Sequence, residues 1–216
     1  MPSHEAGLPC HTLPVPSTVI RRKMALLAIR RIAATMVDYA LVMAYVGALV
    51  LIGVSVRAAG FSLTFGIDGF AGRAVAQLAA MAVLTIPATM WLASREASER
   101  RATPGKRLLG LAVATRSGET LSRPRAFARS ALKLLIPWEL AHTAIWNVFT
   151  WPGAPSDGLN MVLFALTYLL LIVYAVTLFL GTGRTPYDRL CGSVVSEPAR
   201  PGGLTARAHP PAGSGR

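Results

Sequence analysis

The sequence predicts an all-α membrane protein: a four-helix transmembrane bundle of two parallel pseudo-repeats, each ending in a short cytoplasmic helix and a small β-like segment. Three observations support this fold class. Hydrophobic residues make up 53% of the 216 residues and charged residues only 15%, which is too apolar for a typical soluble domain. The apolar residues also gather in long runs, as they do in membrane spans. Finally, one eleven-residue motif occurs twice, after the second and after the fourth run.

Four apolar runs are long enough to cross about 30 Å of hydrocarbon, which takes about 20 helical residues. They cover residues 32–56, 74–93, 130–151 and 161–181. The third run also contains several polar and charged side chains, so the alternative for it is a helix that lies in the interface without crossing.

The distribution of basic residues favours four crossings, because cytoplasmic loops carry an excess of Lys and Arg. If all four runs cross, only Arg57 and Arg73 of the 22 basic residues lie outside. If the third run did not cross, the basic C-terminal segment would lie outside. We therefore expect a multi-pass protein of the inner (plasma) membrane with both termini in the cytoplasm.

The expected domain organisation is a transmembrane domain over residues 30–196 between two disordered cytoplasmic tails, 1–29 and 197–216. The first twenty residues contain four prolines and no long apolar run. Everything interpretable follows Met24, which is therefore an alternative start to Met1.

The internal repeat gives the two halves of the chain a common pattern. Residues 103–113 read TPGKRLLGLAV and residues 185–195 read TPYDRLCGSVV, with six of eleven positions identical. In each copy the Pro can start a short helix, the Thr before it can cap that helix, and the shared Gly can end it. The apolar segments that follow, 111–115 and 193–196, are expected to lie near each other beneath the membrane. Each copy follows an even number of spans, as in parallel repeats related by an axis along the membrane normal.

These motifs, together with RRIAATMVDYAL at residues 30–41, resemble the RDD family of small polytopic membrane proteins. The family is named for one arginine and two aspartates, which map here to Arg31, Asp38 and Asp188. The resemblance covers about residues 30–195. It implies a membrane-embedded domain, and some members of the family are linked to cation/proton exchange and others to membrane-protein assembly.

Asp38 lies at the inner edge of the bilayer if the hydrocarbon begins about 20 residues before the end of the first run. Arg31 is about two turns earlier, too far for pairing along one helix. A partner from another element is therefore expected. The basic candidates on the same side are Lys106, Arg107, Arg129 and Arg189. The main interpretation is a buried ion pair that fixes helix packing, and the alternatives are ion or proton handling or no special role.

Asp188 occupies the repeat position that matches Lys106, so the two copies carry opposite charges there. We expect Arg31, Lys106, Asp38 and Asp188 to meet in one polar cluster on the cytoplasmic side. The alternative for Asp188 is that it simply complements the dipole of its short helix.

Glu139 and His142 form a second candidate site, for protons or ions inside the membrane. They are three residues apart on the third run, so they share a helix face, and Glu139 falls near the bilayer midplane. A charge there costs about 2.5–3.5 kcal/mol on insertion scales, which makes such a residue a functional candidate. In the alternative interpretation Glu139 stays protonated and hydrogen-bonds His142 or Asn147. Pro137 can kink this helix and free a carbonyl group.

No enzymatic motif, metal-ligand spacing or disulfide pattern occurs, so we expect no catalytic activity, metal or cofactor. The basic residues flank apolar runs, which indicates membrane topology and anionic lipid head groups as partners, with no nucleic acid. The favoured function is small-solute or cation/proton transport, with Glu139, His142 and Asp38 as carriers, by an oligomer. The alternative is a membrane-embedded assembly or interaction module that binds a protein partner and whose charged cluster is structural.

Overall fold

The computed structural model describes residues 17–61, 69–150 and 157–198. Its first element is the helix α1, Ser17–Ala58. At 1.5 Å per residue its 42 residues span about 63 Å, roughly twice the thickness of a bilayer core. Residues 17–29 therefore continue the first span as a helix, and the prediction of a disordered tail is wrong for them. The rest of that tail, and residues 199–216 of the other, lie outside the described residues.

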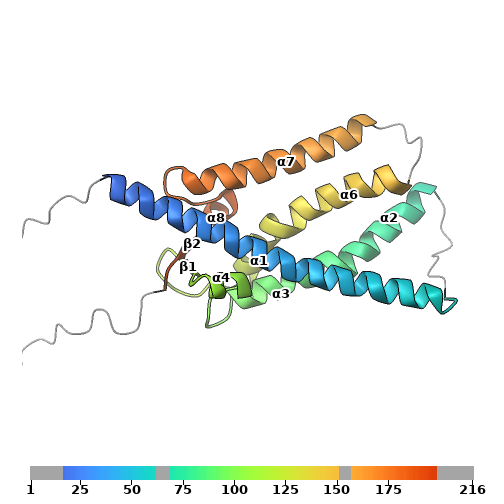
Figure 1. The fold of residues 1–216 in the computed structure, drawn as a ribbon, viewed down its shortest axis with the longest axis horizontal. Coiled ribbons are helices and arrows are strands. Elements are labelled where there is room, and N and C mark those ends of the chain that lie inside the picture. The colour runs from blue at the N-terminus through green and yellow to red at the C-terminus, as the bar shows by residue number, and fades with distance from the viewer. Residues whose placement is uncertain (1–16, 62–68, 151–156, 199–216) are drawn as a thin grey trace, which may run out of the picture.

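Two more helical rods follow, and each contains one π-helical turn. The first joins α2 (Gly69–Ala80), η1 (Met81–Thr85) and α3 (Ile86–Glu96). The second joins α5 (Arg123–Ser130), η2 (Ala131–Leu135) and α6 (Ile136–Thr150). The fourth rod is the single helix α7, Asp157–Phe179, which packs along α6 (Figure 1).

A proline follows each π-helical turn by two residues, which explains the irregularity. Proline has no N–H, so Pro87 cannot donate to the carbonyl of Val83, and Pro137 cannot donate to that of Lys133. Tyrosine hydroxyls from other helices donate instead. Tyr45 bonds the Val83 carbonyl at 2.5 Å and Tyr39 the Lys133 carbonyl at 3.4 Å. The expectation that Pro137 frees a carbonyl is therefore confirmed, and the freed groups tie α1 to both neighbouring rods.

The neighbouring carbonyl of Leu132 is bonded in the same way from α7. Tyr174 donates to it at 2.7 Å. The bent region of the η2 rod is therefore bonded to the first and the last rod at once.

Among the described residues, three helices are long and apolar enough to cross a membrane: 21–58, 74–96 and 158–179. They contain most of the first, second and fourth predicted runs. The outer faces of the rods carry many exposed large apolar side chains, Leu51 and Met161 among them, as expected for lipid contact. The third predicted run lies within the helical residues 123–150, apart from its last residue, which is outside the described part.

Two short helices and two short strands gather beside the N-terminal half of α1 (Figure 1). They are α4 (Pro104–Leu108) with β1 (Ala112–Thr115), and α8 (Pro186–Leu190) with β2 (Ser193–Ser196). The strands pair antiparallel with Val113 opposite Val195, which confirms that the two segments lie together. They close a small apolar core over α3 and α5 that includes Leu111, Val113 and Val195.

The helix α4 touches the backbone of α1 directly, and only a glycine allows this. A Cβ atom at Gly105 would lie 2.1 Å from the carbonyl oxygen of Ala34 and 2.9 Å from a carboxylate oxygen of Asp38. Neither group can move away without shifting the helix. Gly105 therefore sets how closely the short helix approaches the first span.

Candidate functional site

Arg129, at the end of α5, is the centre of a buried charged cluster. Only 1% of its surface is exposed. Its Nη1 donates to both carboxylate oxygens of Glu96 at 2.6 Å, and its Nε and Nη2 donate to Oδ1 of Asp188 at 3.0 and 2.8 Å. One planar guanidinium thus joins the end of α3 to α8, a geometry that lysine cannot reproduce.

Asp188 is completely buried, and both of its oxygens are bonded. Oδ2 accepts from the Arg31 guanidinium and from the Thr185 hydroxyl at 2.8 Å, and Oδ1 also accepts from the Ser193 hydroxyl at 3.0 Å. Burial alone would raise the pKa of Asp188, but Arg129 and Arg31 outweigh it and hold that pKa well below its usual range. Asp188 also accepts from the backbone N–H of Thr185 at 3.3 Å, so it caps its helix as well as pairing with arginine.

Lys106 was one of the candidate partners of Asp38, but it pairs with Glu96. Arg129 pairs with the same carboxylate. Burial, reinforced by the nearby positive charge of Arg129, lowers the pKa of Lys106 to about 7, although Glu96 acts in the opposite direction. Lys106 is 4% exposed, so bulk water does not relieve this. Glu96 was not anticipated, although it is an acidic residue at the end of an apolar run in a basic stretch.

Asp38 has its own set of hydrogen-bond donors, which lie at the start of α4. The Thr103 hydroxyl donates to Oδ2 at 2.7 Å and the Gly105 N–H to Oδ1 at 2.9 Å. The cation nearest to it is Lys133, with Nζ at 3.7 Å from Oδ2. Asp38 is completely buried and holds α4 against α1, which agrees with its main interpretation as a packing lock.

Two of the four predicted cations are not partners of Asp38 for a simple geometric reason. Arg107 and Arg189 lie on the exposed sides of their short helices, and neither makes an ion pair within residues 17–61, 69–150 and 157–198. Arg129 belongs to the cluster but contacts Asp188 and Glu96. The partner that sequence reasoning missed, Lys133, lies on the third run, where it was treated only as an obstacle to crossing.

The cluster as a whole contains four basic and three acidic side chains. The bases are Arg31, Lys106, Arg129 and Lys133, and the acids are Asp38, Glu96 and Asp188. Burial is the main reason that one base, Lys106, holds its proton weakly, and the excess of one positive charge adds to it. Lys106, with its lowered pKa, is the member that can lose a proton near neutral pH.

Glu139, on α6, lies outside this cluster and faces the rod that joins α2, η1 and α3. The Thr85 hydroxyl donates to Oε1 at 2.6 Å and the Gln77 side-chain amide to Oε2 at 3.0 Å; that amide also donates to Thr143 at 3.1 Å. Its partners among the described residues are therefore not His142 or Asn147. Thr85 is the last residue of the π-helical turn η1, which places its hydroxyl toward α6.

The two residues that were expected to accompany Glu139 have other neighbours. His142 stacks near Trp146, with ring centroids 5.8 Å apart, and Asn147 donates to Asn160 on α7 at 3.2 Å. His142 thus faces along its own helix and the structure does not join it to Glu139.

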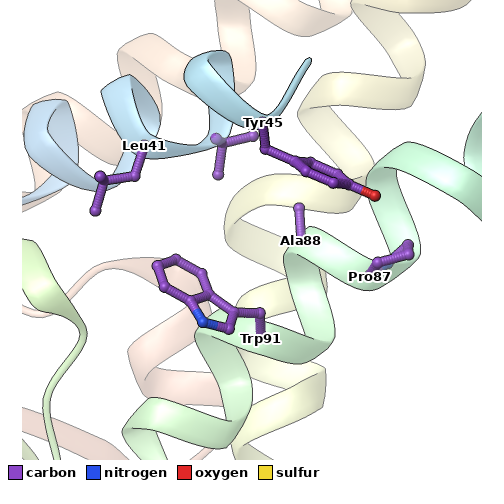
Figure 2. Close-up of a pocket in the computed structure, with 6 residues that line it drawn as sticks. Leu41, Tyr45, Pro87, Ala88 and Trp91 are labelled. Atoms are coloured by element: carbon purple, nitrogen blue, oxygen red, sulfur yellow. The ribbon is translucent and has the colours of Figure 1, made fainter. Parts of the chain in front are cut away.

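Two hollows open between the rods, and both are largely apolar. One, of about 390 Å³, lies between α1 and α3; Figure 2 shows the Tyr45 ring reaching past Ala88 toward Pro87, with Trp91 below. The other, of about 450 Å³, is lined by aromatic side chains of α1, α6, α7 and α8, with Lys133 at its edge. Lipid acyl chains suit such linings better than polar solutes do. Within the described part of the chain, no group of three His, Cys, Asp or Glu side chains could hold a metal ion.

The model of the RDD family matches residues 27–192. The chain belongs to the RDD family. The match contains every charged residue of the buried cluster, Arg31, Asp38 and Asp188 included. With its long apolar helices, the chain is an RDD family membrane protein. No curated protein and no solved structure matches it.

Proposed function

We propose that this RDD protein crosses the inner (plasma) membrane four times, with both termini in the cytoplasm. The third crossing is the η2–α6 part of the rod that joins α5, η2 and α6, whose close packing along α7 supports it. The unequal distribution of basic residues supports the orientation. In a Cys10→Ser background, Cys191 should react only with a cytoplasmic thiol reagent, and Ala59→Cys only with an external one. The opposite labelling pattern would overturn the topology.

The two halves are proposed to be parallel pseudo-repeats. Val113 and Val195 occupy the same position of the repeated motif, and they are also opposite each other in the sheet. In an antiparallel pair this is the position through which a local two-fold axis passes. We propose that this local axis, which passes between the two strands, runs along the membrane normal and relates the two halves as parallel repeats.

The function supported best is transport of a small solute or cation coupled to protons, with Glu139 as the proton carrier. The observation that carries this is the placement of Glu139 between two helices, where its hydrogen-bond partners among the described residues are the neutral donors Gln77 and Thr85. A carboxyl group in that setting is not committed to an ion pair and can take up or release a proton when its neighbours move. His142 and Asp38 are not needed as carriers.

Reconstituted protein tests this proposal. In liposomes with an internal pH dye, the wild type should move protons when a cation gradient is imposed, and Glu139→Gln should abolish the movement. Glu119→Gln, an exposed carboxylate outside the spans, is the matched control and should leave the flux unchanged. Flux that survives in Glu139→Gln would remove the carrier assignment, and absence of flux in the wild type for every cation tried would remove the coupling.

The second candidate is an assembly or interaction module, and one observation favours it. Leu108 and Leu190 occupy matching positions of the two short helices and are 73% and 75% exposed, each beside an exposed arginine. A photo-crosslinker at either position should then give one discrete protein adduct in native membranes. A crosslinker at exposed Leu51 on α1 is the control for random contacts; equal adduct patterns from all three would contradict a specific interface.

Anionic lipid head groups at the basic segment between the second and third spans are proposed as further partners, and an oligomer is proposed because four helices enclose little volume. No role in nucleic-acid binding is proposed. Stability measured in nanodiscs with and without anionic lipid tests the lipid contact. The mass of the protein complex in detergent tests the oligomer.

A further inference from the structure

A hollow of about 680 Å³ that includes five charged side chains in its lining lies where the short helix α4 meets the two strands. Its walls come from distant parts of the chain: residues 99–102 after α3, 107–114 around α4 and β1, and 196–198 at the end of β2. Its volume is within the usual range of about 300–1,000 Å³ for small-molecule sites. It has more charged lining side chains than either hollow between the rods.

The charges in this hollow are predominantly positive. Arg100, Arg101 and Arg107 line it, against Glu99 and Glu197. Glu197 is already paired with Arg30, which does not line the hollow. In the part of the chain that the structure describes, no carboxylate pairs with the three lining arginines. The hollow thus has more guanidinium groups than carboxylates, and none of the three lining arginines forms an ion pair with the residues that the structure describes.

Arg101 is held in place with a conformation that an arginine rarely adopts. Its φ is +50°, the one positive value outside glycine among the described residues. Three bonds fix it: its N–H donates to the Ser98 carbonyl at 2.9 Å, its carbonyl accepts from Val113 at 2.7 Å, and its Nη1 donates to the Gly118 carbonyl at 2.5 Å. The guanidinium is therefore positioned in advance, with its remaining N–H groups still available.

We propose that this hollow binds a phosphate-bearing anion through Arg101 and Arg107. A phosphate group accepts paired N–H donors from planar guanidinium groups, and the three arginines of the hollow offset its repulsion by the nearby Glu99. Arg101 is fixed by the backbone, and Arg107 stands on α4, which Asp38 locks to α1. The site is independent of Glu139, so it stands or falls apart from the transport proposal.

Binding is tested with the purified full chain in an uncharged detergent, with pyrophosphate as the probe at constant ionic strength. Pyrophosphate should raise the melting temperature of the wild type, and Arg107→Gln should weaken the apparent affinity about tenfold or more. Arg189→Gln is the matched control, because Arg189 is the exposed arginine at the same position of the other repeat. It should bind as the wild type does.

Arg101→Gly separates binding from folding. Glycine adopts the positive φ without strain, so this variant should melt no lower than the wild type without ligand, yet lose the response to pyrophosphate. Equal losses in Arg107→Gln and Arg189→Gln would mean that diffuse positive charge is responsible, and would overturn the site.

A second arm identifies the source of the phosphate. The melting temperature is measured in nanodiscs in which phosphatidylglycerol replaces phosphatidylcholine. If phosphatidylglycerol stabilises the wild type but not Arg107→Gln, and pyrophosphate has no effect in detergent, the phosphate belongs to a lipid head group. Stabilisation by pyrophosphate assigns it to a soluble compound. A wild type that responds to neither probe would refute the proposal.

Discussion

The buried charged cluster and the site around Glu139 treat their carboxylates in opposite ways. In the cluster, Asp188 and Glu96 share the guanidinium of Arg129, and water reaches none of the three. Around Glu139 the hydrogen-bond partners among the described residues are neutral, and there the buried side-chain oxygen of Gln77 has no partner of its own. Fully paired charges hold elements together, whereas the carboxyl of Glu139 is held by neutral donors. The comparison supports a stabilising role for the first region, and the exchange proposed above concerns only the second.

The largest effect is expected from Arg129→Met, which leaves Glu96 and Asp188 buried without their shared partner. Breaking a buried pair in this way costs about 3–5 kcal/mol. The free energy of unfolding in mixed micelles should fall by that order, and the yield of folded protein should fall with it. Glu139→Gln should change the same quantity by less than about 1 kcal/mol, because it removes no ion pair. Equal destabilisation by both variants would erase the distinction between the two regions.

Gly105→Ala should destabilise the protein by about 1–3 kcal/mol through overpacking. The new methyl group would meet the Ala34 carbonyl at 2.1 Å and so push α4 and its Asp38 contacts away from α1. The control is Gly53→Ala on α1, the helix that Gly105 contacts. Nothing lies within 4 Å of a Cβ atom added at Gly53, so this variant should not be destabilised. Thermal unfolding followed by circular dichroism compares the two; a Gly105→Ala protein as stable as the wild type would show that α4 is loosely docked.

The pH dependence of stability should report on Lys106. Its pKa falls to about 7 in the folded protein from an ordinary value of 10.5, so between these limits the unfolded chain binds more protons than the folded one. Stability contributed by this group therefore rises with pH, by up to about 1.4 kcal/mol per pH unit. The Lys106→Met variant lacks this titrating amine. The difference in unfolding free energy between wild type and variant should grow in favour of the wild type from pH 7 to 9, and a constant difference would place the proton elsewhere.

The smallest effect is expected at the proline-bent turns. Tyr45→Phe removes the hydroxyl that donates to the Val83 carbonyl, beside the turn that positions Thr85 toward Glu139. A loss of about 0.5–1.5 kcal/mol is expected for one hydrogen bond. Tyr168→Phe, on the exposed side of α7, is the control with no expected change. If Tyr45→Phe also lowers proton flux, the turn and the Glu139 site are coupled; an unaltered stability would show that the freed carbonyl needs no donor.

Much of the fold was predictable because membrane spans and short caps follow local rules. Length and hydropathy indicated the spans, and the twice-repeated Thr-Pro motif predicted two capped helices and the pairing of the segments after them. The helical continuation of α1 before residue 30 was missed. Its side chains mix basic and apolar residues, and no single local signal separates such a helix from a tail.

The candidate sites were predicted in part. Asp38 and Asp188 were expected in one polar cluster with Arg31 and Lys106; the structure buries both aspartates, and most of their partners are other residues. Glu96 joins the cluster from the end of α3 and Lys133 from the π-helical turn η2. Glu139 bonds Gln77 and Thr85, which are 62 and 54 residues away in sequence. Such choices depend on how the rods rotate about their axes, which a one-dimensional pattern does not contain.

By itself, the sequence determined that this chain is a membrane protein of apolar helices with a duplicated short-helix motif, since hydrophobic length, proline and glycine act locally. Only the tertiary structure decided which charges meet. An ion pair requires side chains to approach within about 4 Å, and this follows from helix rotation, from the close approach at Gly105 and from the bends after η1 and η2. The physical reason is that burial is set by local composition, whereas pairing is set by the packing of elements far apart in the chain.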